Sequence, residues 1–299
     1  MKLDELISEI VEDSSSGASQ LTLKAANAYL KLVKEKPSLR AVRRLTKLLA
    51  GARPSMPSIA NIAYRIQSLT SEYVSRGVGV EEAVDEAVRA AIGEYKESLR
   101  KVLKNAREVL GGYDSILTHS YSSTVAAAAE ENDRLKVYVT ESRPGYEGRR
   151  LAERLARRGL RVVLIVDAAA SYVLERKPVD AVVLGCDAIL DDGSIANKIG
   201  SRMIALAAKQ LEVPLNVVTD SWKAAVHGFS PELHPPEEVY GGFEGITILN
   251  PYFEVVPSSL ISLFVSEEVA DPRSFLNYLK QFCDKLVPGG RAGRAKARI

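Results

Sequence analysis

The sequence predicts an α/β protein in which an N-terminal helical domain precedes a Rossmann-like domain built on a parallel sheet. Residues 1–110 repeat apolar side chains every three to four positions, the period of amphipathic helices. From Asp114 onward, short apolar runs alternate with helical stretches, which is typical of parallel strands joined by right-handed crossovers. We therefore expect a helical domain over 1–112, a Rossmann-like domain over 113–286, and a basic, disordered tail over 287–299.

The helical domain is expected to contain several long helices separated by Gly and Pro. Its predicted helices cover about 21–36, 41–51, 58–77 and 80–110. Pro54 and Pro57 separate the second of these from the third, and Gly111-Gly112 ends the helical part of the chain.

Six short apolar runs in the second half are predicted to be strands. They are SILTHS (115–120), LKVYVT (135–140), LRVVLIVD (160–167), DAVVLGCD (180–187), PLNVVTD (214–220) and GITILN (245–250). Helical stretches such as LAERLARRG connect them, and a last helix is predicted over 271–286. No GxGxxG follows the first strand, so a dinucleotide is not indicated.

Composition excludes several classes of function. The 299 residues carry 40 basic and 38 acidic side chains, a net charge of +2 that gives no support to bulk nucleic-acid binding. No apolar run is long enough to span a membrane, and the first residues do not resemble a signal peptide. Two cysteines are too few for a disulfide framework, so we expect a cytoplasmic protein. Three histidines and two cysteines without ligand spacing predict neither a metal nor a cofactor.

The strongest candidate site begins where the strand 181–184 ends, at Asp187. In open α/β sheets, ligands bind outside the carboxyl ends of the strands. Ten residues later, Asn197 and Lys198 precede a predicted helix, whose first N–H groups could hold an anion. A carboxylate, an amide and a cation together favour a phosphorylated small molecule, with Asp187 as a proton donor. The alternative is purely structural: Asp187 caps a turn, Asn197 caps the helix, and Lys198 is solvated.

Other strand ends carry further candidates. The hydroxyls after the first strand, Ser122 among them, and Arg143 in the loop after the second strand could bind a phosphate or a sugar. Lys223 follows a later strand and could face the same crevice. Each of these loops could equally be an ordinary turn, and His119 is expected to be a packed, hydrogen-bonded residue.

Three segments resemble one known superfamily over about residues 40–270. They are VTESRPGYEGRRLA, the block GCDAILDDGSIANKIGS, and NPYFEVVP. The superfamily joins the alpha, beta and delta regulatory subunits of translation initiation factor 2B with methylthioribose-1-phosphate isomerases and archaeal ribose-1,5-bisphosphate isomerases. The resemblance implies the same two-domain fold, and homodimers or larger assemblies joined through the C-terminal domains.

The resemblance also implies roles for particular residues. In the isomerases, a Cys and an Asp carry the proton transfers that convert an aldose 1-phosphate to a ketose. The Asp position is Asp187, whereas the Cys position is Ser120, whose unassisted hydroxyl is a very poor base. Glu147 stands where the methylthioribose enzymes have a substrate-contacting Gln, and Glu254 stands where many relatives have Asp. The positions that match phosphate or sugar contacts are Arg53, Asn197, Lys198 and Lys223.

Two functions follow from this pattern. The first is a non-catalytic regulatory protein related to initiation factor 2B, with a pocket for a phosphorylated sugar or nucleotide and archaeal initiation factor 2 as a partner. The alternative is an aldose-ketose isomerase acting on ribose 1,5-bisphosphate or methylthioribose 1-phosphate, in which Asp187 donates a proton and Ser120 or a water replaces the Cys. We favour the first, because the family Cys is absent.

Overall fold

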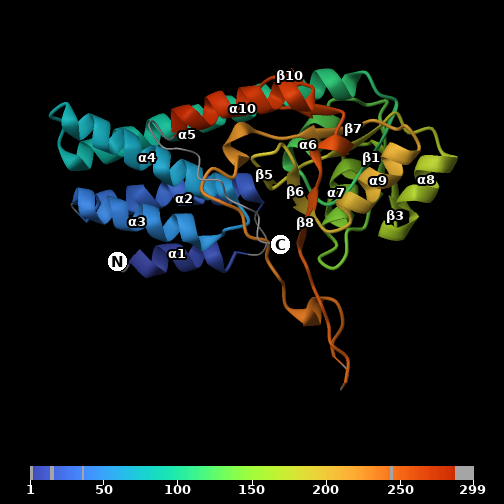
Figure 1. Cartoon of the computed structure of the whole chain (residues 1–299), viewed down its shortest axis with the longest axis horizontal. Helices are drawn as coiled ribbons and strands as arrows, with labels where there is room; N and C mark the ends of the chain where they lie inside the picture. Colours follow the sequence, from blue (N-terminus) through green and yellow to red (C-terminus); the bar gives the residue numbers. More distant parts are fainter. Residues whose placement is uncertain (1–2, 14–16, 36, 243–244, 287–299) are drawn as a thin grey trace. The chain divides into compact units, whose positions relative to one another are not determined.

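The computed structural model describes residues 3–13, 17–35, 37–242 and 245–286. The chain forms two compact units, each with chain segments that are distant in sequence (Figure 1). The helical unit comprises Met1–Leu99, Ser221–Ser230 and Tyr278–Ile299, and the sheet unit comprises Arg100–Asp220 and Pro231–Asn277. The boundaries expected at 112 and 286 stay predictions, and the tail 287–299 lies outside the described residues.

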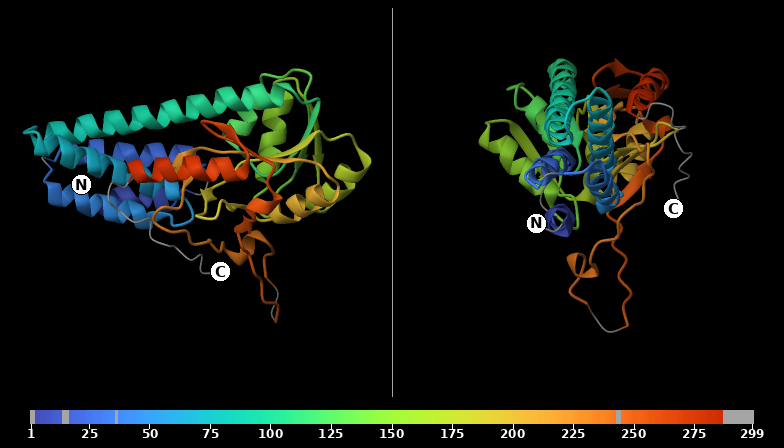
Figure 2. Two further views of the ribbon diagram at one scale, coloured as in Figure 1. Left: turned by 45° about the horizontal axis from the view of Figure 1, so that its top comes forward. Right: turned by 90° about the vertical axis from the view of Figure 1, so that its left-hand side faces the viewer.

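The helical unit is built on helices that pack side by side (Figure 2). They are α1 (Leu3–Val11), α2 (Ala18–Val33), α3 (Leu39–Ala52), α4 (Pro57–Ser75) and the first part of α5 (Val80–Gly111). Their buried positions repeat at three to four residues, as Leu21, Ala25 and Tyr29 do in α2, so each helix turns one apolar stripe inward. The short helix η2 (Ser221–Lys223) buries Trp222 edge-on against Tyr95, with 5.6 Å between ring centroids.

A seven-stranded sheet forms the centre of the sheet unit, with the strand order β10-β9-β7-β4-β1-β2-β3. All neighbouring strands are parallel except β9 and β10. The strands are β1 (Ser115–Thr118), β2 (Lys136–Thr140), β3 (Arg161–Ile165), β4 (Ala181–Leu184), β7 (Leu215–Val218), β9 (Leu263–Val265) and β10 (Val269–Ala270). The helices are the end of α5, α6 (Ser123–Ala129), α7 (Glu147–Arg157), α8 (Ala170–Arg176), α9 (Ser201–Gln210) and the start of α10 (Pro272–Leu286). The predicted α/β class is confirmed.

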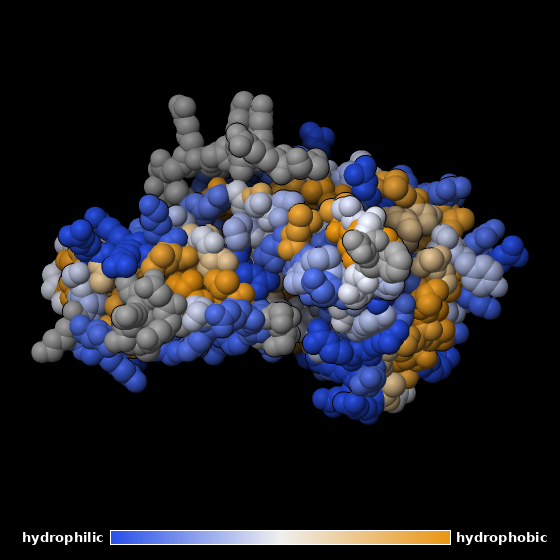
Figure 3. Space-filling view, turned by 90° about the horizontal axis from the view of Figure 1, so that it is seen from below, coloured by the Kyte–Doolittle hydropathy of each residue, from blue (hydrophilic) through white to orange (hydrophobic). Residues whose placement is uncertain are grey.

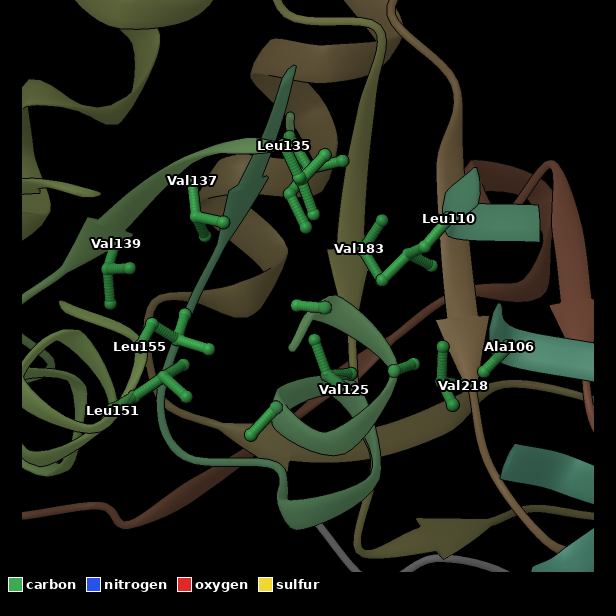
Figure 4. Close-up of a cluster of buried hydrophobic side chains, with 14 of the residues drawn as sticks. Ala106, Leu110, Val125, Leu135, Val137, Val139, Leu151, Leu155, Val183 and Val218 are labelled. Carbon is green, nitrogen blue, oxygen red and sulfur yellow. The ribbon is translucent and has the colours of Figure 1, made fainter. Parts of the chain in front are cut away.

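One face of this sheet carries a continuous apolar core. Alternate strand residues such as Val137, Val139 and Val183 meet Leu151 and Leu155 of α7 in this core (Figure 4). The other labelled residues of the cluster are Val125 of α6, Ala106 and Leu110 of α5, Leu135, and Val218 of β7. Successive strand residues point to opposite faces of a sheet. The residues that alternate with these core residues along each strand therefore point to the other face. Full burial of one such Val or Leu stabilises the fold by about 1.5–3 kcal/mol.

The structure corrects one strand prediction and adds a second sheet. GITILN is not a strand, since Ile246 and Leu249 are exposed by 56% and 72% and have no sheet on which to pack. The strand that pairs with β7 on this side of the sheet is β9, where Phe264 and Val265 are fully buried. The unpredicted sheet is antiparallel and consists of β5 (Ala188–Ile189), β6 (Ile195–Lys198) and β8 (Phe253–Val256).

The surface mixes hydrophilic side chains with apolar patches (Figure 3). In the sheet unit, the large exposed apolar side chains include Leu164, Val166 and Tyr172. Apolar atoms normally make up a large share of a protein surface, so such residues are unremarkable one by one. Among the described helices, none has the length and apolar character that crossing a membrane requires.

Candidate functional site at the carboxyl edge of the sheet

The loops after β1 and β4 meet at the carboxyl edge of the sheet. These strands are neighbours, with Leu117 paired to Val182. A Cβ atom at Gly185 would lie 2.8 Å from Ser122 Cβ, so only glycine allows the two loops to approach so closely. The structure thus places the loop of Ser120 and Ser122 against the loop that leads to Asp187. Both Ser120 and Asp187 are half-buried.

A network of buried polar groups fixes the loops after β1 and β2. His119 is buried, with Nδ1 2.6 Å from Thr140 Oγ1 and Nε2 2.8 Å from the Ile199 carbonyl oxygen. Because a carbonyl only accepts, Nε2 carries the proton, and Nδ1 accepts from the Thr140 hydroxyl. Burial lowers the pKa of His119, which favours this neutral form. The expectation of a packed, hydrogen-bonded histidine is confirmed.

Backbone strain accumulates in the same two loops. Ser120, Ser142 and Tyr146 have φ values of 65°, 62° and 56°, in the left-handed region that non-glycine residues rarely adopt. The Ser120 N–H donates to Ser142 Oγ at 2.7 Å, and the N–H groups of Ser142 and Arg143 each donate to one Asp167 oxygen at 2.7 Å. Such strain persists only where surrounding bonds hold it, and it is concentrated at functional sites.

A buried ion pair lies beside these loops. Lys198 Nζ is 2.7 Å from Glu147 Oε1, and the two side chains are exposed by only 2% and 10%. The Tyr252 hydroxyl donates to the same Glu147 oxygen. Lys198 Nζ also lies 3.3 Å from the centroid of the Tyr252 ring, a cation–π contact. One carboxylate, one ammonium and one phenol therefore form a compact cluster, which we call the Glu147–Lys198–Tyr252 cluster.

The contacts within the cluster shift the pKa values of its three members. Burial alone would raise the pKa of Glu147, but the charge of Lys198 and the hydrogen bonds from Lys198 and Tyr252 outweigh burial and hold that pKa below its usual value. Burial lowers the pKa of Lys198, and the carboxylates of Glu147, Glu238 and Asp187 oppose that effect. Burial and donation to Glu147 raise the pKa of Tyr252, so its hydroxyl keeps its proton.

An arm, residues 231–242 and 245–250, extends from the sheet unit beside the cluster (Figure 2). His234 of the arm stacks on Tyr252, with ring centroids 3.6 Å apart and planes 8° apart. Arg143 donates from Nη2 to the Val239 carbonyl at 2.9 Å and from Nη1 to the Tyr146 hydroxyl. Arg143, a predicted ligand contact, thus connects the loop after β2 to the arm.

The segment 197–200 precedes a helix, as predicted, but Gly200 and not Asn197 is the residue at its N-cap, which corrects the cap role considered for Asn197. Asn197 and Lys198 both belong to β6, paired with Glu254 and Phe253 of β8, and α9 begins only at Ser201. Asn197 Nδ2 donates to Ser201 Oγ at 2.9 Å and so supports the start of the helix from outside it. Lys198 is buried and paired rather than solvated.

The first N–H groups of α9, predicted to hold an anion, already have a carboxylate partner. Glu254 Oε1 accepts from the N–H of Gly200 at 2.5 Å and from that of Arg202 at 3.1 Å. A negative charge at this helix end is favourable because the free N–H groups and the helix dipole are positive there. Gly200 has a φ of 101°, and a Cβ there would come within 3.2 Å of His119.

The sheet unit therefore contains most of the predicted site, while two predicted residues belong to the helical unit. Arg53 donates from Nη1 to the Asp13 carbonyl at 3.1 Å, and Lys223 ends η2. Their roles as ligand contacts stay predictions. The predicted ligand role of Ser122 also stays a prediction; in the structure Ser122 caps α6, and its Oγ accepts from the Val125 N–H at 3.3 Å. Tyr252 and His234 were not predicted, although the motif NPYFEVVP contains Tyr252.

Comparison with known proteins places this arrangement in a family. The model of the family described as "Initiation factor 2 subunit family" matches residues 14–269. The chain belongs to the initiation factor 2 subunit family. It is 33% identical over 243 residues to the ribose 1,5-bisphosphate isomerase of Methanocaldococcus jannaschii, a match that covers 76% of this chain and 75% of that protein.

Two solved structures from Pyrococcus horikoshii OT3 share the fold, each at 24% sequence identity. The translation initiation factor eIF-2B superposes with a TM-score of 0.77 and covers 92% of this chain and 98% of its own. The 5-methylthioribose 1-phosphate isomerase superposes with a TM-score of 0.75 and covers 94% of this chain and 88% of its own. The family thus includes proteins named as factor subunits and proteins named as sugar-phosphate isomerases, as the sequence motifs indicated.

Proposed function

We propose that the sheet unit binds a sugar phosphate at the carboxyl edge of its sheet and isomerises an aldose 1-phosphate to a ketose. One observation carries this proposal: Gly185 lets the loop of Ser120 and Ser122 lie against the loop that leads to Asp187. The 33% identity to a protein named ribose 1,5-bisphosphate isomerase supports the same substrate class. This reverses our preference from the sequence, where the missing Cys favoured a non-catalytic protein.

The proposed reaction needs two proton-handling steps. The sugar ring opens when a proton reaches the ring oxygen, and a hydrogen then moves from C2 to C1 to give the ketose. Asp187 is the proposed proton donor, since it is the half-buried carboxyl group at the end of the central strand β4. His119 cannot act as the base in its observed state, because Nε2 carries its proton toward Ile199 and Nδ1 accepts from Thr140. Ser120 or a water takes the place of the family Cys.

A second candidate function is a non-catalytic regulatory protein, and Ser120 is the observation that favours it. A serine hydroxyl without an adjacent base is a weak proton acceptor, and the imidazole next to it in sequence is already engaged. In that case the pocket would hold a phosphorylated sugar or nucleotide as a signal. A homo-oligomer joined through the sheet unit would then contact archaeal initiation factor 2, in keeping with the relatives named as factor subunits.

The Ser120→Cys variant separates the two candidates. A thiolate is a far better base than an alcohol near neutral pH. If the chain is an isomerase, Ser120→Cys raises turnover of ribose 1,5-bisphosphate at least tenfold, while Ser123→Cys, at an exposed position of the same segment, leaves it unchanged. No turnover by any of the three proteins, with ligand binding retained, favours the regulatory protein.

A further inference from the structure

One face of α3, in the helical unit, carries only positive charge. The helix Leu39–Ala52 contains neither Asp nor Glu, and its basic side chains are all exposed: Arg40, Arg43, Arg44 and Lys47. Residues at positions i, i+3, i+4 and i+7 share one face of an α-helix, so these side chains form a single stripe, which we call the α3 basic stripe. At a rise of 1.5 Å per residue, the stripe is about 10 Å long.

In the described part of the chain, the α3 basic stripe has no partner of opposite charge. No ion pair or side-chain hydrogen bond joins any of its four side chains to another described residue. The basic residues of α7 differ in this respect, since Arg149, Arg154 and Arg157 each lie within 3.0 Å of a glutamate. Solvated helix faces typically alternate the two signs of charge, as α7 does. The α3 basic stripe lacks that alternation, so its charge is available to an anion from outside the chain.

The stripe disfavours the helix that carries it. Like charges three or four residues apart on a helix repel each other, and the stripe contains four such pairs. Arg40 also lies in the first turn, where the positive end of the helix dipole disfavours a cation. A bound polyanion would relieve both effects.

The chemistry of this face fits a nucleic-acid backbone better than a protein or a membrane. The large apolar residues of α3 are buried or half-buried, with Val42, Leu45 and Leu49 in the core. Protein interfaces are built around an apolar centre that is depleted of charge, and a helix that binds a membrane surface needs an exposed apolar face. Phosphates need neither, because the release of their counterions drives binding to Lys and Arg. The guanidinium group also matches phosphate in a bidentate geometry.

We propose that the α3 basic stripe binds the phosphate backbone of a nucleic-acid strand without regard to its sequence. A strand that advances by about 3.4 Å per charge places about three phosphates along the stripe. The whole chain has a net charge of only +2, so the binding belongs to this face and not to the surface at large. The inference is separate from the proposed isomerase reaction, because Asp187 and Ser120 belong to the sheet unit.

The test measures dissociation constants by fluorescence anisotropy for a labelled oligouridylate of about 20 nucleotides, at salt concentrations from about 50 to about 200 mM. At the lowest salt, we expect the wild type to bind with a Kd below about 10⁻⁴ M. The stripe variant, in which Arg40, Arg43, Arg44 and Lys47 are all changed to Gln, should bind at least tenfold more weakly. Each phosphate contact on a single strand contributes about 0.7 to the slope of log K against log salt concentration, so the slope should become shallower by about 2–3.

The matched control removes the same amount of charge from exposed residues that do have partners. Each is paired with a carboxylate four residues away, and the control changes all of them to Gln: Arg76, Arg89, Lys104 and Arg157. Surface pairs of this kind contribute little to stability, so the control should fold. It should bind the oligouridylate within threefold of the wild-type affinity. Equal weakening in the control and in the stripe variant would show that net charge alone matters and would overturn the inference.

Further outcomes concern the ligand and the rest of the chain. An oligothymidylate of the same length should bind within fivefold of the oligouridylate, and a larger difference contradicts a contact made to phosphates alone. Failure of the wild type to bind the oligonucleotides at the lowest salt overturns the inference, even if polyglutamate or phosphatidylserine vesicles bind. Gln in place of Arg291, Arg294, Lys296 and Arg298 should leave affinity unchanged. Loss of binding in that variant, with the stripe variant unaffected, assigns the binding to the C-terminal residues and overturns the inference. None of these results bears on turnover of a sugar phosphate.

Discussion

Lys198 and Glu147 form an ion pair with 2.7 Å between Nζ and Oε1, although the two residues are 51 positions apart. The pair joins the last residue of β6 to the first residue of α7. It therefore connects the second, antiparallel sheet to the loop that follows β2. Because both side chains are almost completely buried, neither charge is solvated, and each depends on the other.

The ion pair is expected to show strong energetic coupling. Breaking a buried pair by removing one partner leaves an uncompensated buried charge, so Glu147→Gln and Lys198→Met should each lower the free energy of unfolding by about 3–5 kcal/mol. The double variant should lose much less than the sum of the two. Denaturant unfolding of all four proteins measures this. Additive losses would mean that the two residues act independently.

Acid should remove part of the stability that Glu147 provides. The folded-state pKa of Glu147 lies below its ordinary value of 4.5, so the unfolded chain binds this proton more readily. The contribution is therefore complete above about pH 4.5 and is lost as the pH falls through the lower, folded-state value. Unfolding of the wild type and Glu147→Gln between pH 7 and pH 3 should show their stabilities converging in acid. A constant difference would contradict the lowered pKa.

Gly148 should not tolerate a side chain. A Cβ atom there would lie 1.8 Å from the Thr140 carbonyl oxygen, where α7 starts against the end of β2. Gly148→Ala must therefore displace backbone, and we expect a loss of at least about 1–3 kcal/mol in unfolding free energy. Gly93→Ala is the matched control, because Gly93 is exposed inside α5 with nothing within 4 Å. That change should stabilise the protein by about 0.5–1 kcal/mol. Equal effects of the two would contradict the close contact.

Glu254 should behave as a built-in anion at the start of α9. Removing its carboxylate in Glu254→Ala frees the N–H groups of Gly200 and Arg202 and should cost about 0.5–2 kcal/mol, as loss of a cap does. The freed N–H groups should then accept an external anion. Thermal unfolding with and without inorganic phosphate should show a larger phosphate-induced increase in Tm for Glu254→Ala than for the wild type. An identical increase would show that these groups are not available to an anion.

The parallel sheet could be predicted because its strands are short, fully apolar runs between turn residues. Ala181–Leu184 and Leu215–Val218 are buried at every position, so their hydrophobicity is continuous and easily recognised. GITILN has a similar composition but no partner strand, so a prediction from composition alone wrongly made it a strand. The short strands of the second sheet escaped prediction because Ala188–Ile189 has two residues and Ile195–Lys198 ends in a charged side chain.

The site could be predicted only where polar or charged residues come directly after a predicted strand. Asp187 and Ser120 follow neighbouring strands, so the close approach of their loops follows from the parallel pairing of β1 and β4. The partner of Glu147 could not be predicted, because Tyr252 is 105 positions away and is brought close by the unpredicted sheet. The burial of Lys198 was missed for the same reason, since the sequence did not indicate that Lys198 ends a strand of this sheet.

The most direct test of the central claim is an NMR time course with ribose 1,5-bisphosphate and with methylthioribose 1-phosphate, using the wild type and Asp187→Asn. Our account predicts that the wild type converts at least one of them to its ketose and that folded Asp187→Asn does not. No ketose from the wild type, with either compound still protecting the protein against thermal unfolding, would contradict the proposed isomerase and leave a sugar-phosphate sensor.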